Sequence, residues 1–261
     1  MRAPTENPLA AGLPDLAADI ITRVRCKHPR VHCLTNAVAQ SFTANVLLAA
    51  GAVPSMTIAP EEIGEFVGRA DALLINLGTL DNERREAAAI AIDAASAEQR
   101  PWVLDPVLVD RSRPRVEFAK ALIARRPGIV RLNCAEFAAI AGIDCGRDAL
   151  ERCAIDRHCV IALTGATDTV TDGVRTASIE NGDARMAQVT AMGCAGTALA
   201  AACLAVEADA WIASCAGPLA FAVAGERAAA SARGPGSFAV EMLDALANLD
   251  GDTLRMHACV R

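Results

Sequence analysis

Short apolar runs that alternate with helix-length segments restrict the fold of this chain more than any other feature. The runs in the middle of the chain are almost free of polar residues, which is typical of strands buried on both faces of a sheet. Parallel strands need a crossover between them, usually a helix. The sequence therefore predicts an α/β fold with a mostly parallel central sheet. The predicted strands are residues 31–36, 52–56, 72–78, 102–107, 128–133 and 159–165.

Helices are expected before and between these strands. Gly51 is suited to ending one helix, and Pro60 followed by two glutamates is suited to beginning the next. The predicted helices are residues 12–27, 41–50, 60–70, 82–97, 116–125 and 135–141.

The pattern changes after residue 165. Asp172-Gly173 and Asn181-Gly182 are dipeptides that favour tight hairpin turns. We therefore expect three short antiparallel strands on one edge of the sheet, at residues 169–171, 175–180 and 185–189. Helices are expected at residues 194–207, 210–232 and 237–249.

The chain has no internal repeat and no stretch with the composition of a linker. We therefore expect residues 1–261 to form a single domain. Its core is predicted at about residues 12–249, with a peripheral tail at 251–261.

Composition and charge exclude several classes of partner. A net charge of −6 and a pI near 5.3 argue against nucleic acid or an anionic membrane surface. Aromatic residues are only 3% of the chain, so stacking surfaces for single-stranded nucleic acid are not expected. No apolar run reaches the roughly 18 uninterrupted residues that a membrane span requires.

The ten cysteines include no CxxC pair and the four histidines are scattered, so a structural zinc site is poorly supported. Residues 1–14 are polar and contain three prolines, unlike a secretory signal. We therefore expect the thiols to remain reduced and the protein to be cytoplasmic.

The stretch from Val189 to Thr197 is predicted to carry the chemistry. It ends a strand-like run, passes through a turn of small residues and opens an alanine-rich helix near Cys194. Unpaired N–H groups and the helix dipole favour an anion at such a turn. The same environment stabilises a thiolate, so we expect Cys194 to be unusually acidic. The alternative is a plain helix N-terminus with a small residue packed beneath it.

The carboxyl ends of several predicted strands carry residues that are mostly polar. Ligands of parallel sheets bind beyond the carboxyl ends of the strands, so we expect these residues to meet the 191–194 turn in one crevice. They are Thr35, Asn36, Met56, Gly78, Asp105, Arg131, Asn133, Thr164 and Gly165.

Several short motifs occur in a specific order along residues 12–249. They are VHCLTN at 31–36, SFTANVLLA at 41–49, LDPV at 104–107, RLNCAE at 131–136, LTG at 163–165, TDG at 171–173 and GPGSF at 234–238. Together they resemble the hydroxyethylthiazole kinase family of the ribokinase-like superfamily. The resemblance implies a single-domain, three-layer α/β/α fold with a mostly parallel central sheet and an antiparallel edge.

The resemblance also implies an activity. Members of this family use ATP and Mg²⁺ to phosphorylate the hydroxyl of 4-methyl-5-(2-hydroxyethyl)thiazole in thiamine salvage, and are typically homotrimers with active sites at subunit interfaces. Two other hypotheses stay open. One is a ribokinase-like kinase of another small alcohol, of the hydroxymethylpyrimidine type, and the other is a catalytically degenerate protein that only binds a small molecule.

Roles for individual residues follow from the resemblance. Cys194 is expected beside the substrate hydroxyl as the catalytic residue. The expected ATP-binding residues are Arg131, Thr164 and Gly193. The expected substrate-binding residues are Met56, Ala191 and Asn36, and the expected Mg²⁺ ligands are Asp105 and Glu136.

Each of these residues also has a structural alternative. Cys194 would be an inert buried thiol, Arg131 a surface ion pair and Met56 ordinary core. Asp105 and Asn36 would serve turns, Glu136 the first turn of a helix, and Thr164 a local backbone hydrogen bond.

The sequence departs from the family pattern near the expected site. Ala191 and Met192 stand where the family usually has Gly and Thr, Leu132 where it usually has Gly, and Ala166 where it usually has Glu. A methyl group at position 191 is unfavourable if the turn needs a positive φ.

Overall fold

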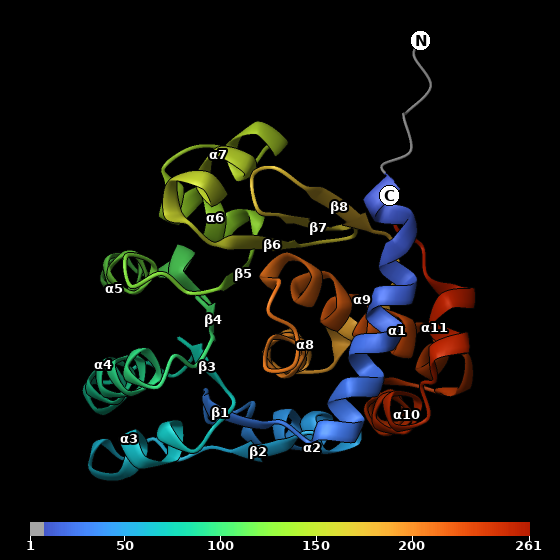
Figure 1. The fold of residues 1–261 in the computed structure, drawn as a ribbon, viewed down its shortest axis with the longest axis horizontal. Helices are drawn as coiled ribbons and strands as arrows, with labels where there is room; N and C mark the ends of the chain where they lie inside the picture. The colour runs from blue at the N-terminus through green and yellow to red at the C-terminus, as the bar shows by residue number, and fades with distance from the viewer. Residues whose placement is uncertain (1–7) are drawn as a thin grey trace.

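An eight-stranded sheet runs through the centre of the computed structural model, which describes residues 8–261 (Figure 1). The strand order is β2-β1-β3-β4-β5-β6-β7-β8, with β2 to β6 parallel and β7 and β8 antiparallel. The mostly parallel sheet with an antiparallel edge is therefore confirmed. The strands are β1 Arg30–Leu34, β2 Val53–Ser55, β3 Ala72–Asn76, β4 Trp102–Asp105, β5 Ile129–Asn133, β6 Val160–Thr164, β7 Asp168–Thr171 and β8 Thr176–Ile179.

Helices cover both faces of the sheet and make the predicted three layers (Figure 1). One layer consists of α3 Pro60–Gly68, α4 Asn82–Ala97, α5 Arg113–Ile123, α6 Cys134–Ala141 and α7 Arg147–Arg157. The other consists of α1 Pro8–Lys27, α2 Gln40–Ala49, α8 Met192–Leu204, α9 Ala210–Ser231, α10 Pro235–Ala247 and α11 Gly251–His257. The two 3₁₀ helices are η1 Val109–Arg111 and η2 Ala184–Gln188.

The central strands are apolar because both of their faces are covered. All five residues of β3 are buried, and so are all four residues of β4. Their side chains alternate between two apolar cores, with Leu74 and Val103 in the core beneath α8 and Leu73 and Leu104 in the core beneath α4.

One predicted strand is wrong. Residues 184–188 form η2, although a strand was expected at 185–189 and a hairpin at Asn181-Gly182. The Asp183 side chain caps η2 by accepting a hydrogen bond from the Arg185 backbone N–H. The place beside β8 is occupied by the C-terminus instead, where Ser178 and Arg261 exchange two backbone hydrogen bonds of 2.7 and 2.9 Å.

The segment predicted as a peripheral tail, residues 251–261, is ordered and packs on the rest of the fold. α11 packs against α1 with Leu254 fully buried, and Val260 pairs with Ile179 of β8. The tail therefore closes the antiparallel edge, which would otherwise present unpaired backbone groups. No helix is predicted at 147–157, where α7 lies, because that segment is rich in charge and has little apolar periodicity. Residues 1–7 of the predicted polar N-terminal segment lie outside the described residues.

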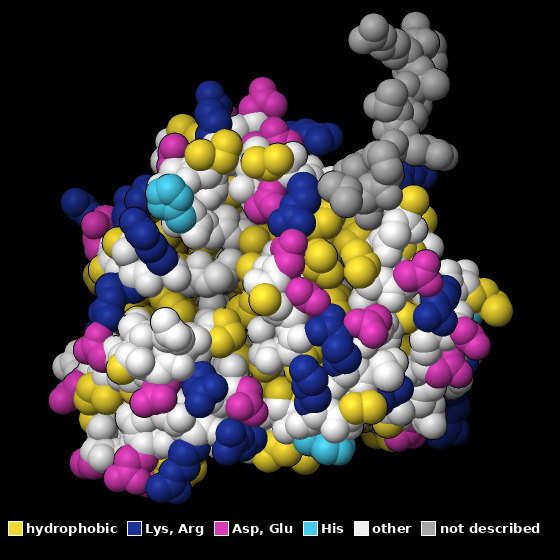
Figure 2. Space-filling model, viewed as in Figure 1, with side chains coloured by type: hydrophobic (Ala, Val, Ile, Leu, Met, Phe, Trp, Pro, Cys, Tyr) yellow, Lys and Arg dark blue, Asp and Glu magenta, His cyan; other side chains and the backbone are white. Residues whose placement is uncertain are grey.

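The distribution of charged side chains on the surface agrees with the small net charge of the chain. Acidic and basic side chains are intermixed over the face drawn in Figure 2. Among residues 8–261, no helix is both long and apolar enough to cross a membrane.

The chain order creates a switch point in the sheet. From β1 the chain moves outward to β2, then returns to place β3 on the other side of β1. α2 and α3 consequently cover opposite faces of the sheet on either side of the point where β1 and β3 run side by side (Figure 1). In parallel sheets, ligands bind beyond the carboxyl ends of the strands near such a point. The fold therefore marks this end of the sheet as the place for a ligand.

The contact between α8 and α9 gives a test of the packing. A Cβ added to Gly217 of α9 would lie 2.8 Å from the Ala200 Cα of α8, so the two backbones would have to separate. We expect Gly217→Ala to lower the free energy of unfolding by about 1–3 kcal/mol in urea denaturation. Gly64→Ala in α3 is the matched control, since its Cβ would lie 3.6 Å from Ile90 Cγ2, in ordinary contact. Equal losses in the two variants would contradict the close approach.

Candidate active site

A cavity of about 300 Å³ lies beyond the carboxyl ends of β4, β5 and β6, against the N-terminus of α8. We call it the Asp105 cavity. Seven of the nine predicted site residues line it: Asp105, Arg131, Glu136, Thr164, Ala191, Gly193 and Cys194. The predicted convergence of strand ends on the 191–194 turn is therefore present for β4, β5 and β6, whereas Thr35, Asn36, Met56 and Gly78 do not line this cavity.

The turn into α8 has the geometry of an anion site. Ala191 precedes the helix with φ 70° and ψ −3°, in the left-handed region that favours glycine. Met192, Gly193 and Cys194 follow in the first turn, where N–H groups have no acceptor within the helix. This turn therefore presents backbone donors to the Asp105 cavity, although an alanine occupies the position that most favours glycine.

A hydrogen-bonded network of buried side chains lies beneath the cavity. Asn36 Nδ2 donates to Asn76 Oδ1 over 3.1 Å and to Cys194 Sγ over 3.4 Å. Asn76 Nδ2 donates to Asp105 Oδ2 over 2.8 Å, and Thr197 Oγ1 donates to the same oxygen over 2.9 Å. The predicted substrate side and the predicted metal side of the site are therefore joined through protein groups.

Asp105 is a nearly buried carboxylate that lines the cavity. Its hydrogen bonds within residues 8–261 are made through Oδ2, which leaves Oδ1 for a ligand. Burial raises its pKa to about 6, and the opposite charge of Arg131 works against that rise.

Cys194 does not have the acidity expected from its place at a helix start. Burial, followed by the negative charge of Asp105, raises the pKa of its thiol to about 11. The hydrogen bond from Asn36 works in the opposite direction but is the weaker influence. The expectation of an acidic Cys194 is therefore wrong, and the side chain is a neutral thiol near pH 7.

Arg131 leaves β5 and reaches across to the start of α8. One terminal nitrogen donates to the Gly193 carbonyl over 2.9 Å and to Thr197 Oγ1 over 3.2 Å. No ion pair to Arg131 is found in the described part of the chain, so the surface salt bridge considered as its alternative role is absent there. The guanidinium lies where it can face an anion held at the helix start.

Glu136 has a structural role as well as a place in the cavity wall. It forms a capping box with Asn133, accepting from the Asn133 backbone N–H over 2.9 Å. Its other oxygen accepts from the Leu108 N–H over 2.9 Å, where Leu108 has a φ of 59°. Glu136 therefore fixes the loop after β4, and burial raises its pKa.

Two carboxylates in one wall suit a hydrated Mg²⁺ better than a fully protein-bound metal. Mg²⁺ in phosphoryl-transfer sites keeps several waters and is held by one or two carboxylates together with the phosphates. Asp105 Oδ1 has no competing hydrogen bond among residues 8–261, whereas both oxygens of Glu136 already accept backbone N–H groups. Within residues 8–261, no group of three or more His, Cys, Asp or Glu side chains is arranged so that it could hold a metal ion. The residues present therefore fit a metal held mainly through Asp105.

A second cavity of about 630 Å³ adjoins the first and is lined by Asp168, so we call it the Asp168 cavity. Residues common to both walls are Arg131, Thr164, Met186, Ala187, Met192 and Gly193. The start of α8 therefore stands between two hollows, with donors available to a group that spans them. Thr164 itself donates weakly, over 3.4 Å, to the Leu132 carbonyl, and the Gly165 N–H is taken by Asp168.

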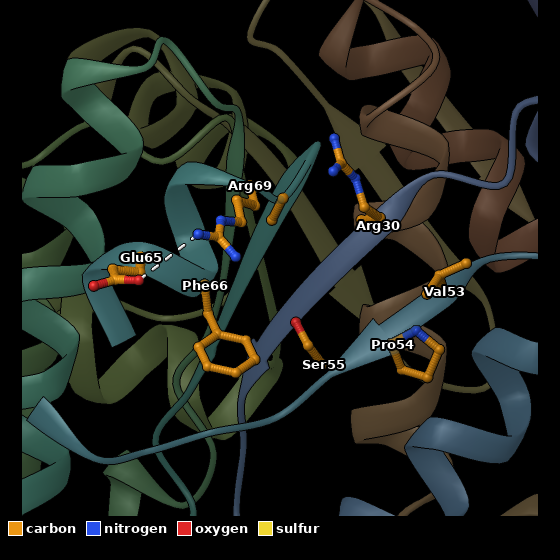
Figure 3. Close-up of a pocket in the computed structure, with 8 residues that line it drawn as sticks. Arg30, Val53, Pro54, Ser55, Glu65, Phe66 and Arg69 are labelled. Atoms are coloured by element: carbon orange, nitrogen blue, oxygen red, sulfur yellow. Dashed lines mark ion pairs between the residues drawn. The ribbon is translucent and has the colours of Figure 1, made fainter. Parts of the chain in front are cut away.

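Met56 and Asn36 lie outside the walls of both cavities. Asn36 is nevertheless joined to Cys194 by its hydrogen bond, whereas Met56 follows β2 at the far edge of the sheet. Next to Met56 is a hollow of about 250 Å³, the Phe66 hollow (Figure 3). Figure 3 shows the Phe66 ring opposite Ser55 and Pro54 of β2, with the Glu65–Arg69 ion pair beside it. One subunit alone does not bring Met56 to the Asp105 cavity.

Three site residues have no counterpart among the predicted ones. Asn76 and Thr197 belong to the buried network, and Met186 of η2 lines both cavities. The sequence does signal Asn76, because it is an amide at the end of an otherwise apolar predicted strand. Thr197 closes the stretch predicted to carry the chemistry, although its side chain has no predicted role, and Met186 has no such signal because it lies in a segment predicted as a strand.

Sequence comparison finds consistent relatives. The hydroxyethylthiazole kinase family model matches residues 21–252. A "probable hydroxyethylthiazole kinase" of Agrobacterium fabrum is 44% identical over 242 residues, which are 93% of each chain. A hydroxyethylthiazole kinase of Granulibacter bethesdensis is 45% identical over 265 residues, covering 96% of this chain and 97% of the relative.

Structural comparison agrees. The hydroxyethylthiazole kinase of Pyrococcus horikoshii superposes with a TM-score of 0.90 and 34% identity over 95% of this chain and 98% of that one. A pyridoxal kinase from Staphylococcus aureus, with a TM-score of 0.60 and 14% identity over 75% of this chain and 87% of that one, shares the fold alone. The ribokinase-like fold prediction is thus confirmed. Since the family model and relatives of high identity span nearly the whole chain, this protein belongs to the hydroxyethylthiazole kinase family.

Proposed function

We propose that this protein transfers a phosphoryl group from ATP to the hydroxyl of 4-methyl-5-(2-hydroxyethyl)thiazole. The observation that supports this most directly is the start of α8, which offers N–H donors between two adjoining cavities. Phosphoryl transfer depends on in-line placement and charge stabilisation, and this turn supplies both beside Arg131. Family membership points to the same reaction.

The two cavities suit different parts of the reaction. The larger Asp168 cavity would hold the nucleotide, with Thr164 and Gly193 at the border and Arg131 facing the phosphates. The Asp105 cavity would hold the transferred phosphoryl group and the reacting end of the alcohol, near Cys194. Mg²⁺ would neutralise phosphate charge there, held by Asp105 with Glu136 behind it.

Cys194 would position the alcohol rather than remove its proton. A thiol with a pKa of about 11 is protonated at pH 7, so it can act as a hydrogen-bond partner for the hydroxyl. A loose transition state makes little demand on a base at this step. Ala191 lines the same cavity and would contact the alcohol there.

We also propose that the chain works as one domain in a cytoplasmic homotrimer with active sites at subunit interfaces. Met56 follows β2 at the open edge of the sheet and Asn36 follows the adjacent strand β1, so a neighbouring subunit at this edge would complete the alcohol site. Large apolar side chains are exposed there, with Leu48 at 58%, Val53 at 47% and Phe66 at 41%. The ten free cysteines are consistent with a reducing compartment.

The first prediction concerns turnover. An ADP-release assay with ATP, Mg²⁺ and hydroxyethylthiazole should give thiazole-dependent turnover that falls, without vanishing, in Cys194→Ala. Because the thiol is protonated well above neutral pH, log kcat should stay nearly flat between pH 7 and 9 in both proteins. If log kcat of the wild-type protein instead rises with pH with a slope near one, and Cys194→Ala abolishes this rise, the thiolate is the base.

The same assay separates the alternatives. Turnover with a hydroxymethylpyrimidine but not the thiazole would favour a kinase of that second type. Binding of either alcohol, seen as a rise in Tm, without ADP release would favour the degenerate binding protein suggested by Ala191, Met192 and Ala166.

The second prediction concerns the strained turn. Ala191 has a φ of 70°, which costs a non-glycine residue about 1–2 kcal/mol. Ala191→Gly should raise the free energy of unfolding by about 1 kcal/mol in urea denaturation, since glycine's larger unfolded-state entropy offsets part of the gain. Ala205→Gly, at the αR residue after α8, should instead lower it. A loss of stability in Ala191→Gly would show that position 191 is unstrained.

The third prediction concerns assembly. Sedimentation equilibrium should give three times the 27.1 kDa chain mass. Val53→Glu places a charge on the exposed β2 edge and should reduce both that mass and thiazole turnover. Val174→Glu, at a side chain 89% exposed in the turn between β7 and β8, is the control and should change neither. A monomer that turns over the thiazole would contradict the interface proposal.

A further inference from the structure

Asn76 and Gly78 lie at the end of β3 and contact side chains of the site, but neither residue has a role in the reaction as described above. Asn76 is fully buried and bonded to both Asn36 and Asp105. Gly78 lies against Asn36, because a Cβ added to it would be 2.6 Å from Asn36 Cβ and 2.8 Å from Asn36 Nδ2. Both residues lie at the switch point of the sheet, where β3 runs beside β1.

Two backbone N–H groups fix which way the amides point. The Ala39 N–H donates to Asn36 Oδ1 over 3.0 Å, so the Asn36 NH₂ group must face Asn76 and Cys194. The Gly78 N–H donates to Asn76 Oδ1 over 3.0 Å, so the Asn76 NH₂ group must face Asp105. The opposite orientation of either amide would bring two donors together.

The orientation of Asp105 follows from that of Asn76. Its Oδ2 receives donors from Asn76 and, on the other side, from Thr197. The Thr197 hydroxyl has one proton and two neighbouring acceptors, Asp105 Oδ2 at 2.9 Å and the Gly193 carbonyl at 3.1 Å, and the shorter contact to the carboxylate oxygen favours Asp105. Oδ1 has no hydrogen bond within residues 8–261, so it is the oxygen available to a ligand in the Asp105 cavity, whose wall includes Asp105.

We propose that Asn76 is the positioning residue of this active site, and that Gly78 gives it the room to act. Through its two functional groups it sets the Asp105 carboxylate on one side and the Asn36 amide, with the Cys194 thiol, on the other. This proposal rests on the proposed function for its kinetic consequences, but the side-chain positions it describes do not depend on which alcohol is phosphorylated.

Asn76→Asp tests the Asp105 side. A carboxylate at 76 still accepts from Asn36 and Gly78, but it cannot donate to Asp105 and it repels that carboxylate. We expect kcat to fall about 10- to 100-fold and the Mg²⁺ concentration for half-maximal rate to rise, with little change in thiazole KM. Crystal structures of the two proteins should show Asp105 rotated in the variant and Asn36 in place.

Gly78→Ala tests the Asn36 side, and keeps the proposal testable if Asn76→Asp does not fold. The added methyl displaces Asn36, so thiazole affinity by calorimetry should fall about tenfold or more while ADP affinity is unchanged. Ser214→Ala is the matched control, because Ser214 is a buried hydroxyl of α9 that lacks a hydrogen-bond partner in the described structure.

The outcomes separate this proposal from the proposed function. A wild-type protein without thiazole turnover would defeat the proposed function, and the crystal structures and calorimetry would still decide the role of Asn76. Unchanged kcat, Mg²⁺ requirement and Asp105 position in Asn76→Asp would overturn the positioning role. So would variants whose Tm falls while every kinetic and binding constant stays at the wild-type value, since a merely structural role predicts that result.

Discussion

The requirement that buried polar groups be hydrogen-bonded governs how this site is built. Asn76, Asp105 and Thr197 are almost completely removed from water, and an unpaired group there costs about 1–3 kcal/mol. The network satisfies them in one arrangement only, because the Ala39 and Gly78 N–H groups fix the amides. One carboxylate oxygen is consumed in this way, and the other is left to the cavity. The hydrogen bonds that stabilise these buried groups therefore also set the positions of the side chains in the site.

The network in turn depends on how closely α8 approaches the sheet. This helix is built almost entirely of small residues, and nearly every one of them is buried. Gly196 leaves room for Phe221, and the Arg131 guanidinium passes 4.0 Å from where a Cβ of Gly193 would be. Thr197 can therefore reach Asp105 from within the helix. Small residues give α8 little amphipathic character, but they bring its N-terminus to the strand ends where an anion can be held.

Most of the fold could be predicted from the sequence, since buried parallel strands and Ala-rich helices leave strong local patterns. The failures lie where tertiary contacts decide. Residues 185–189 look like a strand, yet the edge position they would need is filled by residues 259–261 from the end of the chain. The hydrogen bonds of Asn181 to Glu226 and to the His257 carbonyl pull that turn away from a hairpin. No local pattern encodes such partners.

The prediction that Cys194 is acidic fails for the same reason, because tertiary contacts decide the pKa of its thiol. A helix start and nearby N–H groups favour a thiolate, and that local argument is correct as far as it goes. Its neighbour in the site is the buried Asp105 carboxylate, however, and partial burial also removes much of the hydration of the thiol. Two negative charges there would repel each other and each would lose its hydration, so only one group can ionise readily. Asp105 has donors on both sides and Arg131 nearby, whereas the hydrogen bond from Asn36 to the Cys194 sulfur is long, at 3.4 Å. The negative charge therefore belongs on the carboxylate, and the sulfur stays neutral.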